Sequence, residues 1–136
     1  QLGTKVPEVK MQTAKDIYYK VYESIQNGDI ISASDVSEGG SIITLIEMAI
    51  AGKKGFNIQV TDKVKTLFAE VPAAFVLEMK DLDAADRLIE SELAVQIGTT
   101  TGIQKAVVND HKGTIIDLEI SELEELWKTP FTKYFD

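Results

Sequence analysis

The sequence predicts an α/β (α+β) fold: a mixed β-sheet of about six strands with helices packed on it in three layers. Short apolar runs with strand-like alternation are interleaved with amphipathic helical segments, which favours a sheet covered by helices. One segment, 41–51, is apolar around almost its whole helical circumference, as expected for a helix buried on more than one side. The 136 residues suit one domain, so we expect residues 1–136 to form a single domain with ferredoxin-like βαβ elements.

The first helix is expected to follow an irregular segment over residues 1–10. Thr13 to Asp16 resembles a capping box, and apolar residues then recur every four positions until Asn27-Gly28, a typical helix end. Three tyrosines lie beside this apolar stripe: Tyr18, Tyr19 and Tyr22. We expect them to pack in the core and at its rim, and stacking on a base is the alternative.

Strands and helices should alternate through the middle of the chain. The expected elements are strands over 30–34, 56–60 and 75–79, and a helix over 41–51 that Gly52 ends. Thr61-Asp62 can cap a short helical turn over residues 64–68. In the strand over 75–79, the face that carries Phe75, Leu77 and Met79 is expected to be the buried one.

A helix that contains Leu88 and Ile89 should come next, with Asp81 or Asp83 as its N-cap. A strand over 94–97 would follow, and Gly98 would stop it. The order of strand, helix and strand predicts a βαβ-like or split βαβ unit.

The last part of the chain predicts a β-hairpin and a helix. Residues 104–108 and 114–120 flank a polar turn and should pair with each other. Ser121 to Glu124 resembles a second capping box, and Pro130 is expected to end the helix that it starts. The aromatic tail over 131–135 is expected to dock on the body of the protein.

The overall composition excludes several classes of function. A net charge of −8 repels the nucleic acid backbone and anionic lipid, so neither nucleic acid nor a membrane is an expected partner. There is no cysteine, which excludes thiolate chemistry and fits a reducing, cytoplasmic location. The single histidine, His111, lies in the polar turn, where we expect it at the surface. A Ser/His/Asp triad therefore has no basis in this sequence.

A glycine-rich turn, between the strand over 30–34 and the apolar helix, is the main candidate site. The first turn of a helix has unpaired N–H groups and the positive end of the helix dipole. Gly39 and Gly40 would let an anion approach those groups, and Ser37 and Ser41 add hydroxyl donors, so the turn can bind phosphate. The structural alternative, which stays open, is a tight connection that only lets the helix pack closely.

The acidic residues of this turn need a different role. Asp35 and Glu38 cannot bind phosphate directly, but they can hold Mg²⁺ or orient the loop. A helix terminus supplies only about half an elementary charge, and Lys53 and Lys54 lie at the far end of the helix. Further positive charge would have to come from Mg²⁺ or another domain, so the chain is expected to form half of a site.

The same stretch resembles a known family. Ser34 to Gly40 reads Ser-Asp-Val-Ser-Glu-Gly-Gly, and residues 47–52 read Glu-Met-Ala-Ile-Ala-Gly. Together they resemble the His-Asp-x-Ser-Asp-Gly-Gly…Glu-Met-Ala…Gly signature of phosphoribosylformylglycinamidine synthase, in the C-terminal domain shared by the aminoimidazole ribonucleotide synthetase superfamily. Further similar segments follow in the same order: 1–3, 6–9, 55–56, 67–70, 97–102 and 118–130.

The resemblance implies a domain of an ATP-dependent ligase of de novo purine biosynthesis. The family amidates formylglycinamide ribonucleotide with ammonia from glutamine, and its nucleotide and substrate sites lie between N-type and C-type domains. The implied cofactors are ATP and Mg²⁺. The implied partners are the N-terminal domains of the same synthase, the nucleotide substrate and a glutaminase subunit or domain. The isolated domain should be inactive, and none of its residues is expected to be catalytic.

Some positions depart from the family pattern. Ser34 stands where the family usually has His, and Glu38 stands where it usually has a second Asp. Residues 71–74 lack the arginine that many members have after the segment 67–70, which removes a phosphate contact. Glu70 is a weaker site candidate, because an acid before Pro72 can simply end a helix. These departures favour a structural or non-turnover role for this domain. The alternatives are another superfamily member, such as selenophosphate synthetase or thiamine monophosphate kinase, and a non-catalytic anion-binding scaffold.

Overall fold

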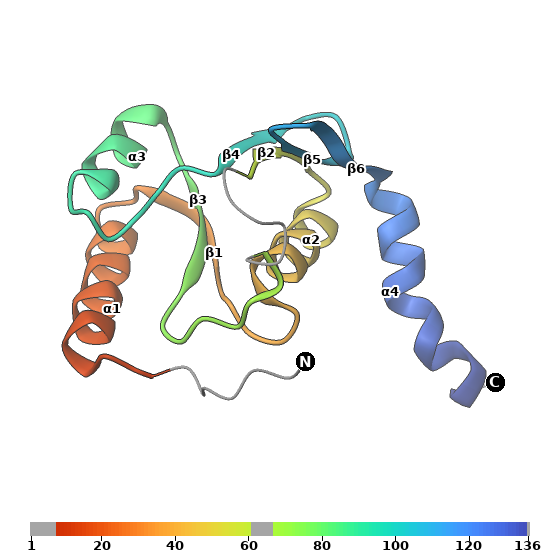
Figure 1. The fold of residues 1–136 in the computed structure, drawn as a ribbon, viewed down its shortest axis with the longest axis horizontal. Helices are drawn as coiled ribbons and strands as arrows, with labels where there is room; N and C mark the ends of the chain where they lie inside the picture. Colours follow the sequence, from red (N-terminus) through yellow and green to blue (C-terminus); the bar gives the residue numbers. More distant parts are fainter. Residues whose placement is uncertain (1–7, 61–66, 136) are drawn as a thin grey trace. The chain divides into compact units, whose positions relative to one another are not determined.

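The six strands within the described residues form two separate sheets (Figure 1). The computed structural model describes residues 8–60 and 67–135, with side chains up to residue 130. The chain divides into two compact units, the first made of Gln1–Thr44 and Phe68–Gln96 and the second of Leu45–Leu67 and Ile97–Asp136. The prediction of an α/β fold with six strands is confirmed, but the strands divide into a two-stranded and a four-stranded sheet instead of one.

The first unit is built around an antiparallel pair of strands. Strand β1 (Ile30–Asp35) pairs with β3 (Phe75–Met79), from Ile30 opposite Met79 to Asp35 opposite Phe75. Helix α1 (Met11–Gln26) precedes β1, and helix α3 (Leu82–Ile89) follows β3. Helix α2 (Gly40–Gly52) begins in this unit, directly after the loop that follows β1.

Asp29 joins four elements of this unit. Its backbone N–H donates to the Ser24 carbonyl near the end of α1, and its carbonyl accepts from the N–H of Lys80. Its buried carboxylate lies 2.8 Å from both the Lys80 Nζ and a terminal nitrogen of Arg87 on α3. The Lys80 hydrogen bond, and then Arg87, holds the pKa of this carboxyl below its ordinary value, against the opposing effect of burial.

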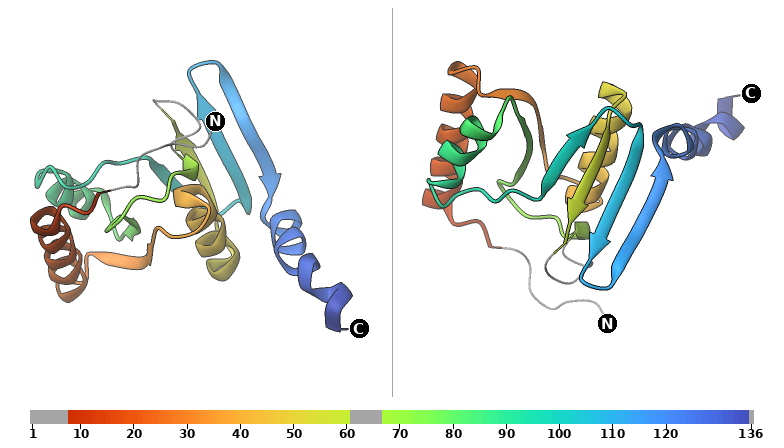
Figure 2. Two further views of the ribbon diagram at one scale, coloured as in Figure 1. Left: turned by 60° about the horizontal axis from the view of Figure 1, so that its bottom comes forward. Right: turned by 90° about the horizontal axis from the view of Figure 1, so that it is seen from above.

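The second unit contains the four-stranded sheet, with strand order β4-β2-β5-β6 (Figure 2). The strands are β2 (Gly55–Gln59), β4 (Gly98–Thr101), β5 (Lys105–Asp110) and β6 (Gly113–Glu119). The two central strands, β2 and β5, are parallel. One face of them is fully buried, because Phe56 lies opposite Ala106 and Ile58 opposite Val108 in the register, and all four are at most 3% exposed.

Helix α4 (Ile120–Phe135) begins directly after β6. The N–H of Ile120, which is buried, donates to the Gln104 carbonyl and anchors the helix to the start of β5. The Glu122 carboxylate accepts from the Glu119 N–H at 3.2 Å, which is the reach-back half of a capping box. The box predicted at Ser121 is therefore displaced by two residues.

Several predicted helix ends are confirmed. Helix α1 ends at Asn27-Gly28 with Gly28 at a positive φ, and Asp81 is the N-cap of α3, its carboxylate accepting from the Ala84 N–H at 2.8 Å. The hairpin of β5 and β6 is confirmed too, with His111 exposed in its turn. The helical turn predicted over 64–68 falls largely outside the described residues, as do the side chains of the aromatic tail.

Two helix boundaries were predicted wrongly. Helix α1 begins two residues before Thr13, and the Asp16 carboxylate accepts from Gln12 Nε2 instead of capping the helix. Pro130 lies inside α4 and does not end it. Proline removes the N–H that would bond to the Leu126 carbonyl, but this part of the helix is exposed, so water can hydrate that carbonyl.

The strand predicted over 94–97 is absent from the structure as described. Those residues are irregular, Val95 is 81% exposed, and the strand begins at Gly98, the residue expected to stop it. A Cβ at Gly98 would lie 2.1 Å from the Asn57 carbonyl oxygen, so β4 and β2 approach closely only because this residue has no side chain. Because β3 and β4 belong to different sheets, they do not form a βαβ unit with α3.

Two burial predictions were also wrong. The buried residue of β3 is Val76, on the face opposite to the one expected. The three tyrosines of α1 are more than half exposed and do not pack in the core, although the Tyr18 ring makes an edge contact with Phe75 at a centroid distance of 5.5 Å.

Among the described residues, no helix is long and apolar enough to cross a membrane.

Replacing Asp29 with asparagine is predicted to remove an acid-sensitive part of the stability. A carboxyl whose pKa is lowered by folding stabilises the protein above its unfolded pKa, about 3.9, and this contribution is lost as the pH falls through the lowered folded value. Urea unfolding should therefore show Asp29→Asn less stable than the parent at pH 7, with the difference shrinking below pH 4. Asp86→Asn, an exposed aspartate of α3, controls for the loss of one charge. A difference that stays constant with pH would contradict this role.

A glycine at position 53 is predicted to stabilise the chain. Lys53 follows α2 with a φ of 49°, and the bonds from the N–H of Lys53 to Ile50 O and from the N–H of Lys54 to Ala49 O define a Schellman motif. The left-handed conformation favours glycine, so Lys53→Gly should raise the free energy of unfolding by about 0.5–1 kcal/mol. Lys54→Gly, one residue on, has no such strain to relieve, so thermal unfolding should show no gain for it.

Candidate phosphate-binding site

The predicted site is a four-residue loop, Val36 to Gly39, between β1 and α2 in the first unit. The Gly40 N–H donates to the Ser37 carbonyl at 3.0 Å, which closes a turn over residues 37–40. Gly39 is the third residue of this turn and has a φ of 82°, the value that a type II turn requires there. The glycine pair thus has a backbone role that does not depend on any ligand.

The side of Gly39 is closed by the helix that follows. A Cβ at Gly39 would lie 2.5 Å from Cγ1 of Ile43, closer than two carbon atoms pack. Gly40 also has a positive φ, 73°, and is buried. A larger residue at position 39 would therefore strain the backbone and displace Ile43. Gly39→Val would therefore disturb the fold as well as any binding at the loop.

Thr44 fixes the spacing between the two ends of the loop, and the sequence analysis did not single it out. This buried residue lies on the first turns of α2, and its hydroxyl is 3.2 Å from the Gly40 carbonyl and 3.4 Å from the Asp35 carbonyl. It therefore holds the last residue of β1 close to the first residue of α2. Its signal in the sequence is that it is an uncharged polar residue between isoleucine and leucine in a helix that is mostly apolar.

The groups that a ligand can reach lie at the start of the loop. Ser37 and Glu38 are exposed and Gly39 is half-buried, whereas Ile42 in the first turn of α2 is only 1% exposed. Ser41 is half-buried and makes an interaction of its own. An anion at this site would meet Ser37, the Gly39 backbone and the edge of Ser41, and the paired Gly40 amide would serve to shape the turn.

The acidic candidates lie around the same end of the strand pair. Asp35 and Glu38 are exposed, and the Val36 N–H donates to the Ala74 carbonyl at 2.9 Å, which holds the segment after Glu70 beside the loop. Glu70 is exposed as well. No group of three or more potential metal-ligating side chains occurs within the part of the chain that the structure describes. Mg²⁺ usually takes one or two carboxylates together with substrate phosphates, so Asp35 and Glu38 suit a shared ion.

A strand, a glycine turn and a helix in this order define an α/β domain, and this arrangement recurs at phosphate-binding sites of other proteins. Residues 1–111 match the family described as AIR synthase related protein, C-terminal domain, and the chain belongs to that family. The match includes the whole candidate site and ends in the turn before β6.

Curated relatives match most of the chain. The chain is 32% identical over 130 residues to the phosphoribosylformylglycinamidine synthase subunit PurL of Thermoanaerobacter sp. (strain X514), covering 90% of this chain. It is 26% identical over 136 residues to the same subunit of Methanocaldococcus jannaschii, covering 95% of this chain. In both cases it spans only 18% of the length of the relative.

Solved structures share the fold. A phosphoribosylformylglycinamidine synthase II from Thermotoga maritima superposes with a TM-score of 0.74, covering 89% of this chain and 23% of that one. T. maritima PurL complexed with FGAR gives a TM-score of 0.70 over 81% of this chain and 20% of that one. The sequence identity is 14% in each case, so these likenesses establish the fold.

Adding one methyl group at Gly39 is predicted to destabilise the first unit. Gly39→Ala combines a left-handed backbone with a contact against Ile43, and should lower the free energy of unfolding by about 1–3 kcal/mol in denaturant titrations. Gly102→Ala is the matched control, because a Cβ there meets nothing within 4 Å. Equal effects of the two substitutions would refute the turn geometry.

Proposed function

We propose that this chain is the C-terminal domain of a phosphoribosylformylglycinamidine synthase, and that it binds nucleotide or substrate phosphate at the loop between β1 and α2. The whole enzyme would amidate formylglycinamide ribonucleotide in de novo purine biosynthesis, with ATP as cofactor. The observation that carries the proposal is the strand–Gly-Gly–helix loop in a chain of this family. The relatives that bear this name and the T. maritima PurL structures complexed with FGAR and with ATP support it.

In this proposal the chain's own groups bind and orient phosphate. Ser37 and Ser41 donate hydroxyl hydrogen bonds, and Gly39 and Gly40 hold the turn that presents its backbone to the phosphate. Asp35 and Glu38 hold Mg²⁺ bound to the phosphates, or keep the loop in position when no metal is present. Glu70 is the weaker candidate, because the bond to the loop comes from Ala74, four residues after it, and not from Glu70 itself. ATP, when bound, supplies the phosphoryl group that activates the amide oxygen of the substrate.

The same proposal makes this domain one half of a site. The chain has a charge of −8, and no lysine or arginine lies between Asp35 and Thr44. The positive charge that phosphate requires would come from Mg²⁺ and from the N-terminal domains of a longer cytoplasmic synthase, of which residues 1–136 form one domain. A glutaminase subunit or domain would supply ammonia. Ser34, Glu38 and the arginine-free segment 71–74 favour an auxiliary role over turnover.

A nuclear magnetic resonance titration of the 136-residue chain with Mg-ATP tests this function. We expect weak binding without hydrolysis, and chemical-shift changes concentrated at the amides of Ser37, Gly39 and Ser41. Ser37→Asp places a carboxylate where phosphate would bind and should weaken binding by about tenfold or more. Ser121→Asp, at the exposed start of α4, is the matched control and should bind like the parent.

The role of Glu38 can be separated in the same titration. If its carboxylate holds the metal, Glu38→Gln weakens the binding of Mg-ATP and leaves ATP without metal unaffected or improved. Shift changes that avoid residues 37–41, or turnover by the chain alone, would contradict the proposal.

A further inference from the structure

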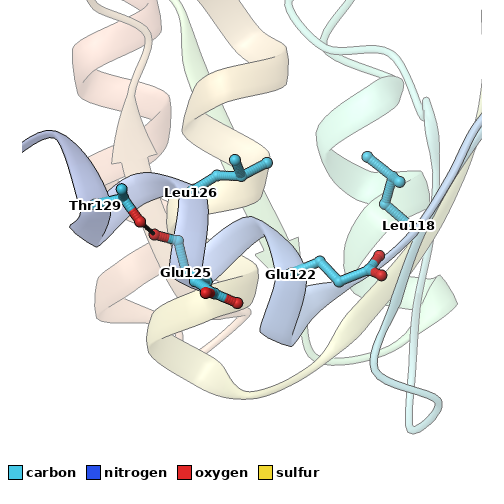
Figure 3. A pocket seen from close by; sticks show the side chains of 5 residues that line it. All are labelled: Leu118, Glu122, Glu125, Leu126 and Thr129. Atoms are coloured by element: carbon cyan, nitrogen blue, oxygen red, sulfur yellow. Dashed lines mark hydrogen bonds between the residues drawn. The ribbon is translucent and has the colours of Figure 1, made fainter.

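Helix α4 and strand β6 enclose an open groove of about 450 Å³ in the second unit (Figure 3). Its walls are Leu118 of β6 and, on α4, Glu122, Glu125, Leu126 and Thr129. The four helical residues are spaced i, i+3, i+4 and i+7, so they form one face of α4. Leu118 and Leu126 are 40% and 66% exposed, and in Figure 3 both point to the same side of the helix.

The groove combines this apolar surface with two carboxylates that have no cation beside them among the side chains that the structure describes. Glu124, on another face of α4, forms an ion pair with Lys128. Lys128, and to a smaller extent Lys53, holds the pKa of the Glu124 carboxyl below its ordinary value. Among the described side chains, Glu125 has no ion-pair partner, and Glu122 only accepts from the Glu119 backbone. As far as its side chains are described, the groove therefore presents two leucines and two carboxylates without a paired cation to whatever covers it.

We propose that this groove is a docking site for a basic amphipathic helix of a partner protein. Such a helix lays its apolar side chains into a hydrophobic groove, as in other helix-in-groove interactions, and its flanking lysines or arginines would meet Glu122 and Glu125. The chain's charge of −8 would also speed the approach of a basic partner.

The charges disfavour the other occupants of such a groove. A second copy of this acidic chain would bring like charge to the carboxylates, and anionic lipid would be repelled in the same way. The groove belongs to the second unit and the phosphate loop to the first, and they share no residue. Its test does not depend on nucleotide binding.

The experiment uses the 136-residue chain and a synthetic helical peptide of leucine and lysine about four turns long. Trp127, the single tryptophan of the chain, is 55% exposed beside Leu126 and reports binding through a blue shift of its fluorescence. We expect saturable binding that weakens as NaCl is raised, and much weaker binding of a peptide with glutamate in place of each lysine.

Two variants test the two halves of the recognition. Leu126→Ala should weaken binding by about tenfold, as for the loss of a central apolar anchor, whereas Ile103→Ala, 72% exposed elsewhere in the same unit, should not. The double variant Glu122→Gln and Glu125→Gln should weaken binding and flatten its salt dependence, whereas Glu90→Gln with Glu92→Gln should do neither. Circular dichroism checks that α4 persists, and the glutamine pair keeps the test valid if Leu126→Ala unfolds the helix.

Three results would overturn the proposal. They are equal binding of the two peptides, groove variants that bind like the parent, and self-association of the free chain through this face in sedimentation experiments.

Discussion

The first unit depends on one nearly buried carboxylate. The Asp29 carboxylate pairs with Lys80, which directly follows β3, and with Arg87 of α3. The Asp29 backbone bonds to the end of α1 and to the same Lys80. A carboxylate in this position is stable only because both cations reach it, since an unpaired buried charge is costly. The pairing fixes the start of β1 relative to α1, β3 and α3.

The far end of β1 is held by weaker contacts, and the candidate site lies there. Thr44 bonds toward Asp35 and Gly40, and Val36 bonds to Ala74, so the loop has a defined conformation although Ser37 and Glu38 are exposed. A rigid strand with a shaped, accessible loop at its end is what a phosphate site needs, because binding groups held in place lose little entropy on binding. The loop itself contributes no basic residue, so the positive charge that phosphate requires would have to come from outside it.

Much of the architecture could be read from local patterns. Apolar spacing located α1 and α2, the glycine after Asn27 located a helix end, and the polar turn around His111 located the β5–β6 hairpin. These features depend on neighbours within a few residues. The division into two sheets depends on which strands, far apart in the chain, pair with each other. Local patterns in a single sequence do not predict that pairing.

The wrongly predicted strand and helix ends also have physical causes that the local sequence does not show. Gly98 looked like a strand end, but its missing side chain admits the neighbouring strand. Pro130 looked like a helix end, yet an exposed helix tolerates the lost bond. At the candidate site the sequence identified the loop and its glycines but not Thr44, and it gave no sign of the distant partners that Asp29 acquires.

The turn over residues 37–40 affects how related sequences should be compared. Gly39 is required by its backbone angle and by Ile43, so a homologue that had lost all affinity for phosphate would still keep it. Ser37 contributes only its carbonyl to the turn, and its exposed hydroxyl is free to be replaced without harm to the fold. Under the proposed function, a diagnostic pattern for phosphate-binding members should therefore be weighted on the serine, because the glycine pair is already required by the turn.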